Sequence, residues 1–198
     1  MDGHFYALLA RMRYIQRWAL MRNTEPENIQ EHSHMVAILA HALALIQNKH
    51  FGGHIDPGQA ALLALYHDAT EILTGDLPTP IKYYNPALRA SYKEVEETAA
   101  NRLLELLPEE LRGDYAPYLL HPDPELEAVV KAADKLDAYL KCVKERKAGN
   151  GEFQTAQAQI WDALQANPLP ALGYYIERYL PSFELTLDEL NGSTHTMF

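Results

Sequence analysis

The sequence has little cysteine and no long apolar run. Cys142 is the only cysteine, which excludes an intrachain disulfide framework and any zinc or iron–sulfur site made of several cysteines. No stretch approaches the roughly 18 uninterrupted apolar residues of a membrane span. The N-terminus also lacks the charge, apolar run and small-residue cleavage site of a signal peptide. We therefore expect a cytoplasmic enzyme or binding protein with no membrane partner.

Positive charge is also scarce. The chain carries 17 Lys and Arg residues against 27 Asp and Glu residues, a net charge of −10. Proteins bind nucleic acids and anionic membranes by neutralising phosphates with Lys and Arg, so we expect no nucleic-acid partner. Residues 1–22 are an exception, because Arg11, Arg13, Arg17 and Arg22 stand there against a single acidic residue. A small anionic ligand could therefore bind near the start of the chain.

Strict alternation of apolar and polar residues is hard to find, whereas apolar residues recur at helical spacing almost throughout. With 198 residues, 47% of them hydrophobic and 22% charged, the chain has an ordinary globular size and composition. The pattern predicts an all-α fold in a single domain over residues 1–198. The predicted helices cover residues 3–21, a segment ending before Gly52, a segment from Asp56-Pro57 to about Leu73, residues 86–107 and 108–119, a segment from Asp123-Pro124 to Gly149, and residues 152–166 and 169–180.

Several catalytic motifs are absent: the sequence has no P-loop, no dinucleotide-binding glycine fingerprint, no Gly-x-Ser-x-Gly elbow and no His-Glu-x-x-His pair. It does have histidine and aspartate at helical positions. His67-Asp68 ends the apolar run 61–66, where an ionised aspartate without a partner would cost several kcal/mol. Glu71 follows on the same helical face. The carboxylate of Asp68 in this apolar setting needs a cation or a hydrogen-bond network.

Asp134 and His32 are two further candidates from other helices. Asp134 lies within the apolar helical pattern of residues 129–136, and His32 opens the second predicted helix. Together with His67-Asp68 they would suit one divalent ion such as Mn, Co, Fe or Mg, and an octahedral ion would keep two positions open for water and a substrate oxygen. The alternative is a buried polar network in which Asp134 pairs with Lys131 or Lys135. Spacing alone does not decide between them.

Two other histidine pairs are rival chelates. In His32-Ser33-His34 the two imidazoles stand two residues apart, which places them on opposite sides of a helix. His50 and His54 flank a predicted loop, but no nearby carboxylate clearly completes that site.

Three segments carry a resemblance to a known superfamily. Glu31-His32-Ser33, Tyr66 to Glu71 and Lys131 to Asp134 resemble the ordered H…HD…D signature of the HD-domain phosphohydrolases, all-α proteins with a metal site inside the helical bundle. The resemblance is closer still to one branch, the bacterial 5′-deoxynucleotidases. The supporting segments are Gln16 to Asn23, which contains Arg17-Trp18, Leu73 to Pro80, Ala138 to Cys142, and Pro181 to Leu185. It covers most of the chain and is weakest over residues 108–125 and the C-terminal tail.

The resemblance implies a helical bundle that hydrolyses 2′-deoxyribonucleoside 5′-monophosphates, works as a homodimer and holds one divalent ion per subunit, cobalt, manganese or a similar transition metal. Arg17 would orient the phosphate, Trp18 would pack against the sugar, and Glu71 would assist proton transfer. The metal ligands would be His32, His67, Asp68 and Asp134, of which His32 and Asp134 also border the substrate. The nucleotide site would be lined by Asp76, Leu77, Pro78 and Thr79.

Other interpretations stay open. Trp18 could instead anchor the first helix in the core, and Arg17 could pair with a surface carboxylate. Asp137, one turn after Asp134, departs from the branch, as does His34, and it adds a second acid that could alter the coordination. A related HD-domain enzyme could cleave triphosphates, cyclic nucleotides or guanosine polyphosphates. A non-catalytic helical scaffold is the alternative outside enzymes.

Overall fold

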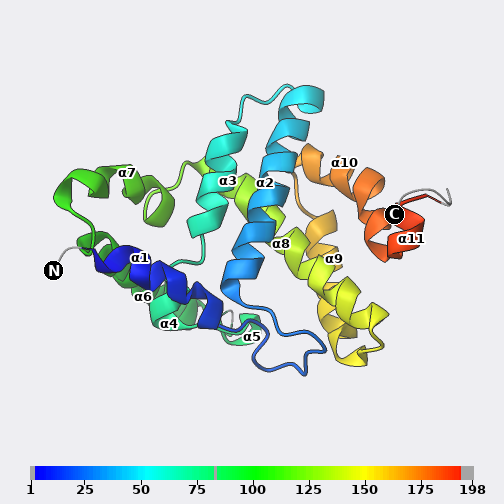
Figure 1. Ribbon diagram of the computed structural model, residues 1–198, viewed down its shortest axis with the longest axis horizontal. Helices are drawn as coiled ribbons and strands as arrows, with labels where there is room; N and C mark the ends of the chain where they lie inside the picture. Colours follow the sequence, from blue (N-terminus) through cyan, green and yellow to red (C-terminus); the bar gives the residue numbers. More distant parts are fainter. Residues whose placement is uncertain (1–2, 83, 193–198) are drawn as a thin grey trace.

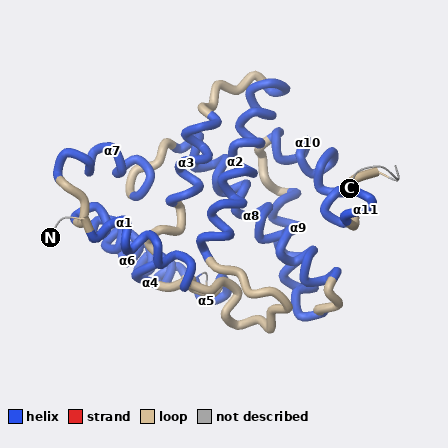
Figure 2. The backbone as a smooth tube through the Cα atoms, viewed as in Figure 1, coloured by secondary structure: helices blue, strands red, loops and turns tan. Residues whose placement is uncertain are grey.

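The computed structural model describes residues 3–82 and 84–192, apart from the side chain of Thr79. Every regular element in this part is a helix, and an isolated antiparallel bridge between Gln16 and Asn28 is the one strand-like pairing that it contains. Figure 2 shows these helices joined by loops. The prediction of an all-α fold is confirmed.

Three helices form the centre of the molecule (Figure 1). Small side chains lie between them, among which Ala40, Ala64 and Ala133 are fully buried, so the helix axes can approach closely. Leu43 and Leu136 fill the remaining space and are also fully buried. The central helices are α2, Ile29–Phe51, α3, Pro57–Tyr66, and α8, Pro124–Lys147, and they are followed by α9, Gln154–Gln165, and α10, Pro170–Tyr179.

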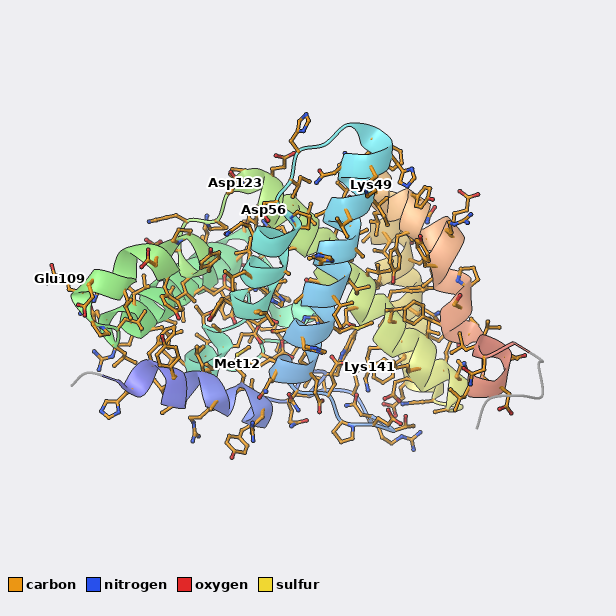
Figure 3. The ribbon with its side chains drawn as sticks, turned by 45° about the horizontal axis from the view of Figure 1, so that its top comes forward. Met12, Lys49, Asp56, Glu109, Asp123 and Lys141 are labelled. Carbon is orange, nitrogen blue, oxygen red and sulfur yellow. The ribbon has the colours of Figure 1, made fainter. Side chains whose placement is uncertain are left out.

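Each central helix begins at a side-chain cap. Asn28 accepts hydrogen bonds from two backbone N–H groups of the first turn of α2, and Glu31 completes a capping box. Asp56 and Asp123 cap α3 and α8, each followed by proline at the first helical position, as the sequence predicts (Figure 3). Helix α2 ends at Gly52, whose φ of 68° is a left-handed conformation that glycine adopts without a Cβ clash.

A second apolar cluster supports the turn that follows α3. Phe5 and Ala69 are fully buried in this cluster, and Ala69 belongs to the turn itself. The burial of Ala69 holds in place the two residues before it, His67 and Asp68. The helices that form the cluster are α1, His4–Leu9, α6, Pro86–Glu105, and α7, Glu109–Leu119.

The prediction of one helix over residues 3–21 is wrong for the second half of that range. Helix α1 ends at Leu9 and is followed by the 3₁₀ helix η1, Ala10–Tyr14. Ile15 is then extended, and its carbonyl oxygen accepts a hydrogen bond of 3.0 Å from the N–H of Ile29. The chain therefore pairs with the segment before α2 instead of continuing the helix. Apolar spacing does not reveal this, because the partner is distant in sequence.

The third predicted helix also ends early. Helix α3 stops at Tyr66, and a turn separates it from α4, Glu71–Thr74. Within the turn the N–H of Ala69 donates to the carbonyl of Tyr66, and the N–H of Glu71 donates to that of Asp68, each at 3.0 Å. These bonds span three residues instead of four, so the turn is tighter than an α-helix. His67 and Asp68 thus lie at a helix end.

The remaining elements are short: α5, Thr79–Lys82, η2, Gly151–Phe153, η3, Leu180–Glu184, and α11, Leu187–Leu190. Among the described residues, no helix combines the length and the apolar character that a membrane crossing requires.

Candidate metal and phosphate site

His32 lies in the first turn of α2, and its side chain is fully buried. Its Nδ1 is 2.6 Å from Oδ2 of Asp137, a buried residue of α8. An ionised carboxylate only accepts hydrogen bonds, so Nδ1–H donates to it. The other ring nitrogen, Nε2, then lies 3.1 Å from Oδ1 of Asp134 and 3.6 Å from Oδ2 of Asp68.

His67 faces the same point from the end of α3. Its Nδ1 is 2.6 Å from the carbonyl oxygen of Ala64. A carbonyl oxygen only accepts, so Nδ1 carries the proton and the lone pair of the neutral ring is on Nε2. That Nε2 lies 3.2 Å from Oδ2 of Asp68. Two different hydrogen bonds thus direct the Nε2 atoms of both histidines toward the same carboxylate, that of Asp68.

The donor set fits a divalent cation. The Nε2 atoms of His32 and His67 are buried and make no hydrogen bond. The ligand atoms of His32, His67 and Asp68 all lie within 4.8 Å of one another. A cation among them would coordinate both nitrogens and at the same time neutralise the carboxylates that face them. Asp134 is not part of that group of three, but its Oδ1 lies 3.1 Å from Nε2 of His32, so its carboxylate borders the same point.

The alternative pairing of Asp134 with Lys131 is not seen. The Nζ atom of Lys131 instead lies 2.6 Å from Glu127, one turn earlier on α8.

The other histidines of the two rival chelates lie away from this cluster. His34 is exposed on α2, whereas His32 is buried. The ring of His50 stacks on that of Tyr174 with their centroids 4.6 Å apart.

The electrostatics of the cluster also favour a cation. Burial and Arg17 oppose protonation of His32, but Asp134, Asp137 and Asp68 outweigh them and raise its pKa to about 9. Burial opposes ionisation of Asp134, yet its pKa is lowered by His32, His67 and Arg17. Asp134 therefore stays charged beside the imidazoles, and the cluster draws positive charge, as a proton or as a metal cation, to this point.

Arg17 reaches the cluster from the loop before α2. Its Nη1 is 3.8 Å from Oδ2 of Asp68, and its Nε is 2.9 Å from Oε1 of Glu27. The Arg17 side chain is 12% exposed and that of Glu27 is 15% exposed, so the pair is not on the open surface. Glu27 is a contact that the sequence analysis missed, because no local pattern links it to Arg17. It holds one edge of the guanidinium and directs another toward the cluster.

Trp18 and Asp76 meet beside Arg17. Trp18 lies outside any helix, so the interpretation of it as an anchor of the first helix is wrong. Burial raises the pKa of Asp76, and Arg17 opposes that shift. The backbone of Trp18 also lies near enough to the Asp76 carboxyl to favour its ionised form and so oppose the same rise in pKa. Leu77 and Pro78 follow Asp76 between α4 and α5, and Thr79 begins α5 with its side chain outside the described part.

Glu71 begins α4 and is 8% exposed. Burial and then the neighbouring carboxylates of Asp68 and Asp76 raise its pKa to about 10. Its Oε2 atom is buried without a hydrogen-bond partner. Glu71 therefore holds a proton at neutral pH next to the cluster.

The helical fold, with a His–Asp cluster near its centre, is that of the HD-domain class of proteins. An HD-domain phosphohydrolase from Listeria innocua has the same fold, with a TM-score of 0.79 over 91% of this chain and 88% of its own at 21% identity. The cyanophage S-2L HD phosphohydrolase DatZ, solved with dA and one catalytic Zn²⁺, gives a TM-score of 0.63 over 92% of this chain and 99% of its own at 22% identity.

Sequence comparison identifies the particular family. Residues 4–183 match the family described as 5′-deoxynucleotidase YfbR-like. The chain is 53% identical to 5′-deoxynucleotidase VP0926 of Vibrio parahaemolyticus and 52% identical to the 5′-deoxynucleotidase of Vibrio cholerae, in both cases over 96% of this chain and 99% of the relative. The chain belongs to the family of YfbR-like 5′-deoxynucleotidases.

Proposed function

We propose that the protein hydrolyses 2′-deoxyribonucleoside 5′-monophosphates to a deoxynucleoside and phosphate. The observation that carries this is the pair of buried Nε2 atoms of His32 and His67, which face the carboxylates with the Arg17 guanidinium beside them. The near full-length similarity to 5′-deoxynucleotidases supports the same activity. One divalent ion per subunit, cobalt or manganese, would be held by His32, His67, Asp68 and Asp134.

A divalent ion in this site supplies Lewis acidity toward a phosphoryl oxygen and lowers the pKa of bound water. Arg17 binds the phosphate through the guanidinium edge that Glu27 leaves free, which orients the substrate for in-line attack. Burial favours the protonated form of Glu71 by raising its pKa, so Glu71 would give a proton to the 5′-oxygen as that oxygen leaves. Trp18 and Asp76 would border the sugar, and the indole would exclude a 2′-hydroxyl. By the resemblance, Leu77, Pro78 and Thr79 would line the nucleotide site as well.

The test is a hydrolysis panel of deoxy- and ribonucleoside monophosphates, nucleoside triphosphates, cyclic nucleotides and guanosine polyphosphates, with Co²⁺ or Mn²⁺ added. We expect phosphate release chiefly from the deoxynucleoside monophosphates. Asp68→Ala should lose bound metal and activity together, whereas Asp162→Asn, a change at an exposed position of α9, should lose neither. Full turnover by metal-free Asp68→Ala, or preference for another substrate class, would contradict the proposal.

We also propose that residues 1–198 form a single phosphohydrolase domain, as the near full-length similarity to 5′-deoxynucleotidases suggests. By the same family resemblance we expect a homodimer in the cytoplasm. The exposed apolar side chains of Ile38 and Leu45 on α2 are available for an interface. Light scattering coupled to size-exclusion chromatography would measure the mass. A monomer at micromolar concentration would contradict the dimer.

A further inference from the structure

The loop of residues 17–27, which carries Arg17 and Trp18, is closed at its base. The N–H of Arg17 donates to the carbonyl of Glu27 at 2.9 Å, and Gln16 and Asn28 form the antiparallel bridge next to it. In Figure 1 this loop is the blue segment that leaves η1, runs below the central helices and returns to α2. Closure at the base alone leaves the far end of the loop unconstrained.

The far end is bound by a buried polar cluster on α8 and the turn after it. Glu145 is 1% exposed and accepts hydrogen bonds from the backbone N–H of Thr24 at 2.9 Å and from its hydroxyl at 2.7 Å. Lys141 donates to Glu145 and to the carbonyl of Glu25. Asn150 donates to Glu145 at 2.9 Å and to the carbonyl of Arg22 at 2.6 Å. Figure 3 shows Lys141 near this loop.

Glu145 is charged in this cluster. Burial opposes its ionisation, but the donors on Lys141, Asn150 and Thr24 lower its pKa to about 2. A buried ion pair contributes little net stability compared with apolar packing of the same volume. Unlike apolar side chains, the cluster forms hydrogen bonds with backbone groups of the loop, at Arg22, Thr24 and Glu25.

The loop also stores backbone strain. Trp18 has a φ of 59°, the one positive φ among the described non-glycine residues, and such a conformation costs about 1–3 kcal/mol unless its surroundings hold it. Its ring packs against Phe153 with the centroids 5.2 Å apart. Lys141 lies on Phe153 in turn, with its Nζ 5.7 Å from the ring centroid. The cluster thus contacts both the far end of the loop and the residue behind Trp18.

We propose that Lys141, Glu145 and Asn150 are positioning residues that hold the loop of residues 17–27 so that Arg17 and Trp18 face the substrate, and that they thereby set the preference for deoxyribose over ribose. The proposal rests on the proposed function. None of the three residues belongs to the His–Asp cluster, so they act through the loop and not through the metal.

The central variant is Glu145→Gln, which keeps the shape of the side chain and removes its charge. The matched control is Glu127→Gln, because Glu127 also pairs with a lysine four residues away on α8, but at the surface. We expect Glu145→Gln to keep wild-type metal content and to lose about 10- to 100-fold in kcat/KM for deoxynucleoside monophosphates. The deoxy-to-ribo ratio of kcat/KM should fall as well, and the control should match the wild type in each measurement.

A second readout does not depend on activity. The chain has two tryptophans, so Trp161→Phe leaves Trp18 as the sole indole fluorophore. In that background Glu145→Gln should increase acrylamide quenching of Trp18 and lower its anisotropy, whereas Glu127→Gln should change neither. If the wild type hydrolyses no deoxynucleotide, the proposed function fails, and the fluorescence still tests the loop.

Thr24→Val is the milder variant if Glu145→Gln does not fold. It removes only the hydroxyl bond to Glu145 and keeps the backbone N–H bond. We expect a smaller change in the same direction in the sugar ratio and in Trp18 quenching. An unchanged sugar ratio and unchanged quenching in a folded Glu145→Gln or Thr24→Val protein would overturn the proposal.

Discussion

Asp137 gives the sharpest test of how the site is built. It is no predicted ligand, yet its carboxylate holds Nδ1 of His32 at 2.6 Å in a buried position. A hydrogen bond to a charged group contributes about 1.5–3 kcal/mol, and about 1.4 kcal/mol corresponds to a tenfold change in affinity. Its removal should therefore weaken metal binding about 10- to 100-fold, the range typical of residues that orient a metal-ligating histidine.

Two substitutions separate the charge of Asp137 from its hydrogen bond. In Asp137→Asn the amide oxygen can still accept from Nδ1–H of His32, so only the charge assistance is lost. We expect Co²⁺ affinity to fall about tenfold in this variant and toward 100-fold in Asp137→Ala, where the imidazole loses its partner. Competition with a chromophoric chelator measures the affinity, and thermal unfolding in EDTA shows whether each variant folds. Asp162→Asn on α9 is the exposed control.

Two results would refute this reasoning. Wild-type Co²⁺ affinity in folded Asp137→Ala would show that His32 needs no orienting carboxylate. Loss of all binding in Asp137→Asn, with a changed Co²⁺ visible spectrum on residual occupancy, would show that Asp137 is itself a ligand. That second outcome is the alternative coordination that the extra acid beside Asp134 leaves open in the sequence.

Three further predictions concern the groups around the cluster. Arg17→Ala should keep its metal but lose about 100-fold in kcat/KM, because the phosphate is no longer oriented; wild-type kinetics would remove Arg17 from the site. Trp18→Ala should bring the kcat/KM values for deoxy and ribo substrates together, and an unchanged ratio would place sugar selection elsewhere. Glu71 keeps its proton in the folded state up to about pH 10, whereas its usual pKa is 4.5. Below pH 4.5 this carboxyl is protonated in the folded and the unfolded state, so it costs no stability. As pH rises above 4.5, only the unfolded state loses the proton, and the free energy of unfolding falls by up to about 1.4 kcal/mol per pH unit. In EDTA, Glu71→Gln should thus gain stability over the wild type between pH 6 and about pH 9 in urea titrations, and a pH-independent difference would contradict the raised pKa.

Much of the fold follows from local signals in the sequence. Asp56-Pro57 and Asp123-Pro124 begin α3 and α8 where capping chemistry predicts, and Gly52 ends α2. The failures come where a distant partner competes with the helix. Ile15 is extended because it pairs with Ile29, and α3 stops before His67, where the chain tightens into a turn around the buried Ala69.

The sequence by itself determined the helical class, because helical periodicity is a local property of the chain. It assigned the four candidate ligands to a metal only through the resemblance, since spacing alone left a buried polar network open. Only the tertiary structure decided their partners: Asp137 on His32, Glu27 on Arg17, and Glu145 on the loop that carries Trp18. Each of these contacts joins groups on different elements. The free energy that selects them comes from burial and hydrogen bonding in three dimensions, which no pattern along the chain encodes.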